Sequence, residues 1–179
     1  SKYLSAISNS LIVTVVSSII ASVFAIPLAW LIARYNFKFR NGIIILVTMA
    51  SVSPPFLGAY AWRLMLGSSG LITNFFGLDF SIMGMHGVIW VIIWLIYPLI
   101  FLTSLDSFMG MDPTLTESAH SLGASRFRAF MNIEVPLAMP GIITGLYLAG
   151  ITAFSDFGTP MIITLNLEML PKLIYQEFM

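Results

Sequence analysis

Few residues in this sequence are of the types that do chemistry, and their spacing forms no catalytic or metal-binding pattern. None of the 179 residues is cysteine, which removes thiol nucleophiles, thiolate metal sites and disulfides. His86 and His120 fall on opposite sides of the membrane in the topology developed below, so they are not expected to share a metal. No Gly-x-x-x-x-Gly-Lys-Ser/Thr phosphate loop is present. The sequence therefore predicts no catalytic residue, no metal site and no cofactor bound by this chain.

The charged residues are scarce and segregated. They make up 9% of the chain and sum to a net charge of zero, whereas apolar residues make up 58%. Soluble domains carry roughly a quarter charged residues. No basic run with interleaved aromatic residues occurs, so nucleic acid is not expected as a partner. Four long stretches contain no charged residue: Tyr3–Ala33, Asn41–Trp62, Phe80–Leu105 and Val135–Ser155.

These uncharged stretches predict membrane-spanning helices. About 20 apolar residues cross a bilayer core of about 30 Å. A soluble helical bundle would need a polar face at helical spacing, and segments such as Leu11–Trp30 have none. A signal peptide is rejected because the first apolar run is too long. The fold class predicted is an all-α polytopic membrane protein with four spans, placed at about Asn9–Ala33, Gly42–Leu66, Met85–Leu105 and Pro136–Phe154.

The basic residues predict which side each connection faces. Cytoplasmic loops carry an excess of Lys and Arg. The connection after the first span contains Arg34, Lys38 and Arg40, and the connection after the third contains Arg126 and Arg128. Both connections are therefore expected in the cytoplasm, with the start of the chain and the Gly67–Gly84 connection outside. Because the chain begins with Ser and ends without a polar tail, we expect one domain, 1–179, that is part of a longer protein.

The long connection from Asp106 to Glu134 predicts a bent amphipathic helix pair. Asp112 before Pro113 is a helix start, and a capping box formed by Thr114 and Glu117 is an alternative start. Leu115, Ala119 and Leu122 follow at helical spacing and form one apolar stripe. Gly123 permits a sharp break before a second short helix that contains Phe127, Phe130 and Met131 on one side and Arg126 and Arg128 on another.

Two interpretations of this pair were compared. A helix that lies on lipid headgroups would need a richly basic polar face, and two arginines opposed by Glu117 and Glu134 do not supply it. A helix presented to a groove on a soluble partner fits the pattern better.

The spacing of five residues in this segment resembles the EAA signature of ABC importer permeases. That signature is Glu-Ala-Ala, three residues, Gly, nine residues, Ile, one residue and Leu-Pro, and it matches Glu117, Ala119, Gly123, Ile133 and Pro136. Phe127, Phe130 and Pro140-Gly141-Ile142 also agree with the wider family pattern. Ser118 replaces the middle alanine and Val135 replaces the leucine.

The resemblance implies a type I ABC importer permease in a bacterial cytoplasmic (inner) membrane. The segment of about 112–136 would then dock on a separate ATP-binding subunit, which binds the ATP. A second permease half and an extracytoplasmic solute-binding protein are the other expected partners, besides the lipid bilayer. The coupling residues implied are Glu117, Ser118, Ala119, Leu122, Gly123, Arg126, Phe127, Ile133 and Pro136.

Two further segments are candidates for the translocation path. Pro54 and Pro55 break the second span, and open backbone in a membrane must face protein or a water-filled cavity. The alternative is a tolerated kink packed against neighbouring helices. Asp156 follows the fourth span beside Ser155, where an acidic residue is either functional or a helix cap. Tyr60 completes the candidate set.

The solute is predicted only by resemblance. Ser155–Pro160, together with the segment from Pro54 to Tyr60, resembles permeases of ferric iron importers and also those for aminoethylphosphonate and polyamines. Ferric iron is the preferred solute and the other two are alternatives. A secondary transporter or channel is a more distant alternative, because it would need coupling-ion residues inside the spans. Gly141, Gly145 and Ala149 are expected to allow close helix packing.

Overall fold

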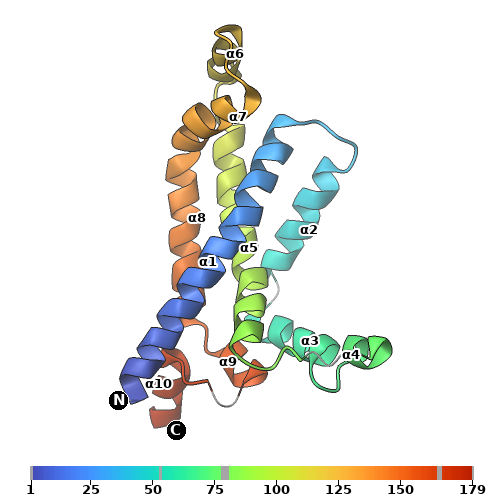
Figure 1. The fold of residues 1–179 in the computed structure, drawn as a ribbon, viewed down its shortest axis with the longest axis vertical. Helices are drawn as coiled ribbons and strands as arrows, with labels where there is room; N and C mark the ends of the chain where they lie inside the picture. Colours follow the sequence, from blue (N-terminus) through green and yellow to red (C-terminus); the bar gives the residue numbers. More distant parts are fainter. Residues whose placement is uncertain (1, 53, 78–80, 165–166, 179) are drawn as a thin grey trace.

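The computed structural model describes residues 2–52, 54–77, 81–164 and 167–178, and all regular secondary structure in these ranges is helical. The long helices are α1 (Lys2–Arg34), α5 (Met85–Met109) and α8 (Val135–Ser155), and they lie side by side in Figure 1. The shorter α2 (Arg40–Val52) runs alongside α5. The predicted all-α class is confirmed.

Three of the four predicted spans are confirmed as continuous helices. By length and composition, Lys2–Arg34, Met85–Met109 and Arg126–Ser155 could each cross a membrane. The last of these joins α7 (Arg126–Ala129), a π-helical turn η1 (Phe130–Glu134) and α8 without a break. The predicted first, third and fourth spans lie inside these three helices.

The predicted second span, Gly42–Leu66, is a pair of helices that is sharply bent at the predicted proline break. The chain turns by 104° between Arg40–Val52 and Pro55–Phe76. The 13 residues of α2 rise about 20 Å, short of a bilayer core. Pro54 is extended, with φ −58° and ψ 135°, and neither Pro54 nor Pro55 has an N–H to continue the helical ladder. Position 53, which precedes these prolines, lies outside the described residues.

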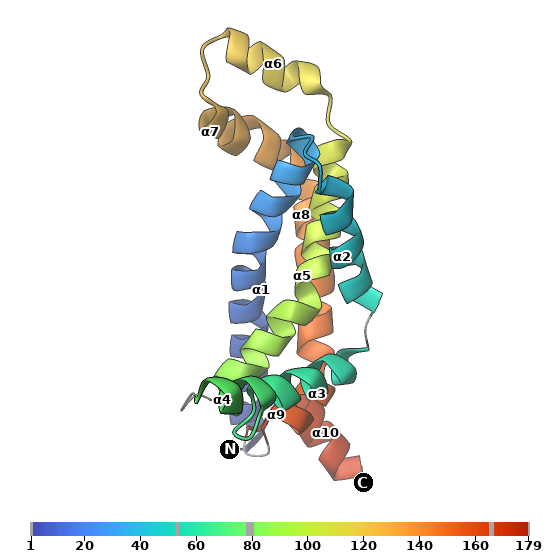
Figure 2. The same ribbon diagram turned by 90° about the vertical axis from the view of Figure 1, so that its right-hand side faces the viewer.

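Beyond the break, α3 (Pro55–Leu66) and α4 (Leu71–Phe76) lie across the end of the bundle instead of continuing along it (Figure 2). The Gly67–Gly84 connection therefore contains a short helix, which its turn-forming residues did not predict. Residues 78–80 of that connection lie outside the described residues. Arg63 Nη1 donates to the carbonyl oxygen of Ile162, 2.9 Å away, and so joins α3 to α9 (Gly158–Ile163).

Small residues allow the three long helices to approach closely. On α1, the small residues Ser10, Ser17, Ala21, Ala25 and Ala29 are buried, and α1 packs mainly on α5. On α8, a Cβ added at Gly141 would overlap the Ser107 side chain of α5, and one added at Gly145 would overlap Thr103. Ala149 is also buried. The close contact predicted for the Gly141, Gly145 and Ala149 stripe is confirmed. Since lipid supplies no hydrophobic drive for helix association, this contact area holds the helices together.

The two ends of the bundle differ in what they contain. At one end lie α6 (Pro113–Ser121) and α7, beside the end of α1 and the start of α2 (Figure 1). At the other end lie α3, α4, α9 and α10 (Leu170–Phe178). There, Asn9 Nδ2 donates to the carbonyl oxygen of Glu168 at 2.9 Å, and Ser10 Oγ accepts from Leu170 N at 2.9 Å. The predicted sidedness is consistent with this arrangement, because the loop arginines gather at the α6 end.

The glycine contact between α5 and α8 generates a stability prediction. Gly141→Leu should separate the helices and destabilise the protein by about 1–3 kcal/mol, because the added side chain has no space beside Ser107. Gly150→Leu is the matched control on the same helix, since nothing lies within 4 Å of a Cβ added at Gly150. The measurement is the temperature at which the detergent-solubilised protein loses its monodisperse chromatographic peak. Equal temperatures for the two variants would contradict the prediction.

Candidate functional site

The start of α6 is fixed by a local hydrogen bond. Asp112 is extended and its Oδ1 accepts from the backbone N of Thr114 at 2.9 Å, while Pro113 occupies the first turn. The Asp112 start is therefore confirmed over the Thr114–Glu117 capping box. Hydrogen bonds from Thr114 lower the pKa of the Asp112 carboxyl, so the cap stays charged at neutral pH.

Gly123 forms the predicted break between the two short helices. It has φ 85°, a left-handed conformation that a side chain would strain. The turn is closed by a hydrogen bond from Ala124 N to the Ala119 carbonyl oxygen at 3.0 Å. Then Ser125 Oγ accepts from Arg128 N at 3.3 Å and caps α7. We call residues 112–129 the arm, since Figure 2 shows α6 projecting beyond the ends of the long helices.

The arm presents apolar side chains outward. Leu122 is 90% exposed and Phe127 is 72% exposed, whereas Ala119 is buried against the chain. The predicted stripe of Leu115, Ala119 and Leu122 is therefore not a core face. Exposed apolar residues gathered on a projecting segment are typical of an interaction surface. Of the other predicted coupling residues, Glu117, Ser118, Gly123 and Arg126 are exposed on the arm, and Ile133 and Pro136 lie at its base in η1 and α8.

A buried polar cluster lies beneath the arm, and sequence reasoning missed it. Glu134 is only 2% exposed. Its Oε1 lies 2.9 Å from Arg34 Nε and accepts from Thr116 Oγ1 at 2.9 Å, and its Oε2 accepts from Trp30 Nε1. The sequence placed Arg34 and Glu134 at the same membrane side, at the ends of two spans. This shared side was the one feature of the sequence that could have indicated an ion pair between Arg34 and Glu134.

The outer end holds the second group of candidates. Asp156 follows α8 and its Oδ1 accepts from Gly158 N at 3.1 Å and from Thr159 N at 3.5 Å, so it caps α9. The side chain is 9% exposed, and Oδ2 is buried with no hydrogen-bond partner among the described residues. Burial raises the pKa of Asp156 despite the hydrogen bonds from Thr159 and Gly158.

The residues after the break between α2 and α3 and the residues at the end of α8 lie on two sides of the Asp156 carboxylate. A pocket of 370 Å³ lies between them, lined by Pro55, Phe56, Leu95, Thr152, Ser155, Asp156, Phe157 and Gly158. Path candidates from two distant segments, Pro55 on one side and the neighbouring Ser155 and Asp156 on the other, thus share one pocket, and Pro54 precedes Pro55 in the chain. Tyr60 does not line it. Tyr60 lines a separate pocket of 440 Å³ with Arg63 and Ser68.

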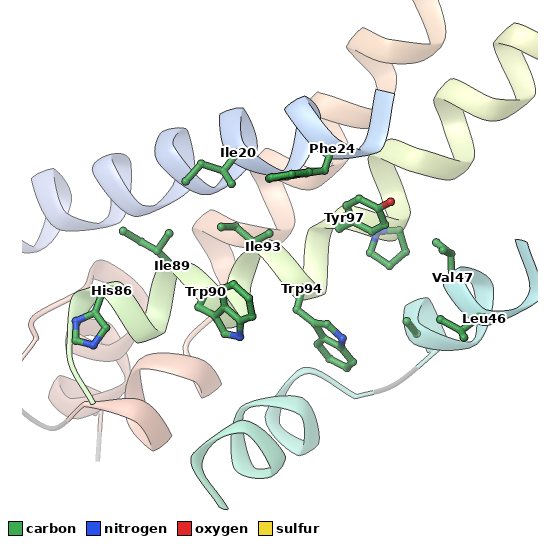
Figure 3. Close-up of a pocket in the computed structure, with 12 residues that line it drawn as sticks. Ile20, Phe24, Leu46, Val47, His86, Ile89, Trp90, Ile93, Trp94 and Tyr97 are labelled. Carbon is green, nitrogen blue, oxygen red and sulfur yellow. The ribbon is translucent and has the colours of Figure 1, made fainter. Parts of the chain in front are cut away.

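A further cavity is apolar and differs from both sites. It has a volume of 740 Å³ and lies between α1, α2 and α5, where Figure 3 shows Phe24, Trp90, Trp94 and Tyr97 around it. Apart from His86, its lining residues are apolar or aromatic. Such a surface suits acyl chains or another apolar helix and offers an ion no charged partner. Among the described residues, no three His, Cys, Asp or Glu side chains are grouped to hold a metal ion.

Comparison with known proteins gives a family match over most of the chain. Residues 25–179 match the family described as binding-protein-dependent transport system inner membrane component. The chain is 32% identical over 168 residues to the molybdenum transport system permease protein of Haemophilus influenzae, covering 92% of this chain and 73% of that protein. It is 27% identical over 175 residues to the ferric transport system permease protein of Actinobacillus pleuropneumoniae, covering 94% of this chain and 26% of that protein.

A solved structure has the same fold. A chain of a bacterial alginate ABC transporter, in complex with its alginate pentasaccharide-bound periplasmic protein, superposes with a TM-score of 0.80 at 21% identity. The match covers 98% of this chain and 67% of that one. Relatives named for molybdenum, or for molybdate and tungstate, are spanned over 64 to 73% of their length, so this chain corresponds to about two thirds of such a protein.

Proposed function

This chain belongs to the family of binding-protein-dependent transport system inner membrane components, and from that premise we propose that it is the permease part of an ABC importer. The observation that supports this most is the arm. It is a capped, sharply bent helix pair at one end of the bundle, and the apolar side chains of Leu122 and Phe127 on it are largely exposed. An amphipathic helix of this kind fits a groove on a partner protein.

In the proposed mechanism the arm docks on a separate ATP-binding subunit. Closure of that subunit on ATP displaces α6, and the break at Gly123 lets α6 pivot without unwinding α7. Because α7, η1 and α8 form one continuous helix from Arg126 to Ser155, the displacement reaches the other end of the bundle. Glu117, Ser118 and Arg126 are the polar contacts proposed beside the apolar residues.

The outer pocket is the proposed part of the translocation path in this chain. The backbone at Pro54 leaves the helical ladder there, which in a membrane is tolerated where it faces protein or water. Asp156 puts an unpaired carboxylate oxygen in the pocket formed with Pro55 and Ser155. A second permease half would complete the path, and a solute-binding protein would deliver the solute at the α3 and α9 end. The bacterial inner membrane is the proposed location.

The relatives are named for different solutes. Those named for molybdenum, or for molybdate and tungstate, come from several organisms, which favours these tetrahedral oxyanions. Ferric iron, predicted from Ser155–Pro160, is the second candidate and has one named relative in its favour. Aminoethylphosphonate and polyamines remain the alternatives predicted from the sequence. A secondary transporter or channel is disfavoured by the projecting arm.

The arm generates a test of the function itself. Leu122→Asp should weaken co-purification of the ATP-binding subunit about ten- to hundred-fold and reduce ATP-dependent uptake in parallel, because a buried leucine contact contributes about 1.5–3 kcal/mol. The matched control is Leu71→Asp on α4, at the other end of the bundle, where the leucine is 75% exposed. Pull-down of the ATP-binding subunit with the complete permease measures the effect. If both variants retain the subunit equally, the arm is not its docking site.

Asp156 generates a second test, which separates a path residue from a cap. Asp156→Asn keeps the Oδ1 acceptor for Gly158 and Thr159 but removes the charge. Uptake should change about ten-fold while assembly is unchanged: it should rise for an oxyanion, which the carboxylate repels, and fall for ferric iron, which the carboxylate attracts. Because burial raises the pKa of Asp156, the same change should begin in the wild type, as the pH falls, at a higher pH than an ordinary aspartate would cause, and uptake by the variant should not follow that titration. Unchanged uptake by Asp156→Asn would leave this residue with a structural role alone.

The solute is tested by direct uptake. The complete permease, assembled in proteoliposomes with its ATP-binding subunit and solute-binding protein, should accumulate radiolabelled molybdate when ATP is supplied. Excess tungstate should abolish this accumulation, because the two oxyanions share shape and charge, whereas ferric citrate should not. Accumulation of iron without molybdate would reverse the order of the two candidates.

A further inference from the structure

The buried carboxylate of Glu134 joins three segments that are distant in the sequence. It contacts Arg34 and Trp30 from α1, Thr116 from α6, and it belongs to η1 at the base of α8. We infer that Glu134 is a positioning residue that ties the arm to α1, so that movement of the arm displaces α1 together with α8. This inference rests on the proposed function of the arm as the docking segment.

The energetics of the cluster favour a fixed geometry. A carboxylate that is 2% exposed is costly unless its oxygens are paired and hydrogen-bonded. Glu134 meets this requirement with one cation and two neutral donors, each from a different direction. Arg34 is itself largely buried, and its Nη2 also lies 3.3 Å from Thr116 Oγ1. Displacing Thr116 would therefore disturb both charged partners.

Aromatic packing holds the α1 side of the cluster in place. The Trp30 ring lies 4.7 Å from the Phe130 ring, centroid to centroid, and 6.0 Å from Tyr35 in an edge-on arrangement. Phe130 in turn lies 6.4 Å from Phe108 of α5. Contacts with Phe130 and Tyr35 therefore hold the Trp30 ring in the orientation in which its N–H donates to Glu134. A π-helical turn, an element frequent at functional sites, ends at Glu134.

Chain connectivity explains why this contact matters for transmission. The arm is joined covalently to α5 on one side and to η1 and α8 on the other. It has no short covalent connection to α1. Among the described residues, two other polar contacts join the arm region to α1 or its end. Arg34 Nη2 lies 3.9 Å from Met111 Sδ, which is a weak acceptor, and Arg126 Nη1 donates to the Tyr35 hydroxyl at 3.2 Å in an exposed pair. Glu134 is therefore the strongest polar connection between the arm and α1.

The test removes the Thr116 hydroxyl, which donates to Glu134 and accepts from Arg34, and it leaves the exposed Leu122 and Phe127 of the arm unchanged. Thr116→Val deletes the hydroxyl that donates to Glu134, and Thr116→Ser restores it. Thr144→Val is the matched control, because the Thr144 hydroxyl donates only within α8, to the Pro140 carbonyl oxygen at 2.8 Å. Since none of the 179 residues is cysteine, spin labels can be placed at Leu4→Cys, on the exposed outer part of α1, and Ile151→Cys, on the exposed outer part of α8.

The readout is the ATP-dependent change in the distance between these labels, in the complete complex reconstituted in lipid vesicles. Because α1 and α8 move together when they are coupled, we expect only a small change in the unsubstituted chain. In Thr116→Val we expect the change to be at least two-fold larger while the ATP-binding subunit still co-purifies in full, and we expect Thr116→Ser to return it to the small value. Glu134→Gln should act in the same direction, because the amide has no negative charge for Arg34. A purely structural role would instead reduce assembly and leave the distance change of the assembled complexes intact.

The outcomes separate this inference from the function on which it rests. If ATP changes the distance equally in Thr116→Val, Thr144→Val and the otherwise unsubstituted chain, the positioning role of Glu134 is wrong and the permease function stands. Loss of the ATP-binding subunit in Thr116→Val would also overturn it, because the hydroxyl would then serve docking. If the unsubstituted chain neither binds that subunit nor responds to ATP, the proposed function fails and this inference fails with it.

Discussion

Backbone groups in lipid have no water to bond with, and this constraint decides where the chain can be irregular. The three long helices are continuous, so most of their backbone polar groups are bonded within each helix, except beside Pro27, Pro98 and Pro140, which have no N–H to donate. The departures occur at the bundle ends, at the arm and at Gly67–Gly84, and at one deeper place, the break beside Pro54. There the freed backbone adjoins the Asp156 pocket, but Pro54 and Pro55 are exposed within this chain, so in a membrane they must face water or another protein.

Features with a local cause could be predicted from the sequence. The lengths of α1, α5 and α8 follow from uncharged stretches between charged residues, the start of α6 follows from Asp112 and Pro113, and the break follows from Gly123. The proline pair was correctly identified as a helix breaker. The 104° turn could not be predicted, because its direction depends on how α3 packs on α9 through contacts such as Arg63 with Ile162.

The sequence located the segments that form the candidate sites, but it did not show which of their residues are exposed or which share a pocket. An apolar stripe such as Leu115, Ala119 and Leu122 is the same in sequence whether it faces a core or a partner, and only the fold separates buried Ala119 from exposed Leu122. Likewise, Pro55 and Asp156 were singled out separately, and their shared pocket depends on tertiary packing. Glu134 was missed because a single acidic residue before a span has no periodic pattern, and its partners come from two other helices.

The continuous helix from Arg126 to Ser155 gives the two sites a physical connection. Its 30 residues extend about 45 Å without an intervening loop, although the π-helical turn η1 and Pro140 interrupt the regular hydrogen-bond ladder. The arm contains its first turn, α7, and Asp156 follows its last residue. A displacement at one end therefore cannot be absorbed by a flexible linker before it reaches the other. The close contact of Gly141 and Gly145 with α5 sets the line along which the helix can slide or tilt, since an added Cβ there would overlap α5. Packing thus restricts the movement, while the arm and Glu134 determine which helices take part in it.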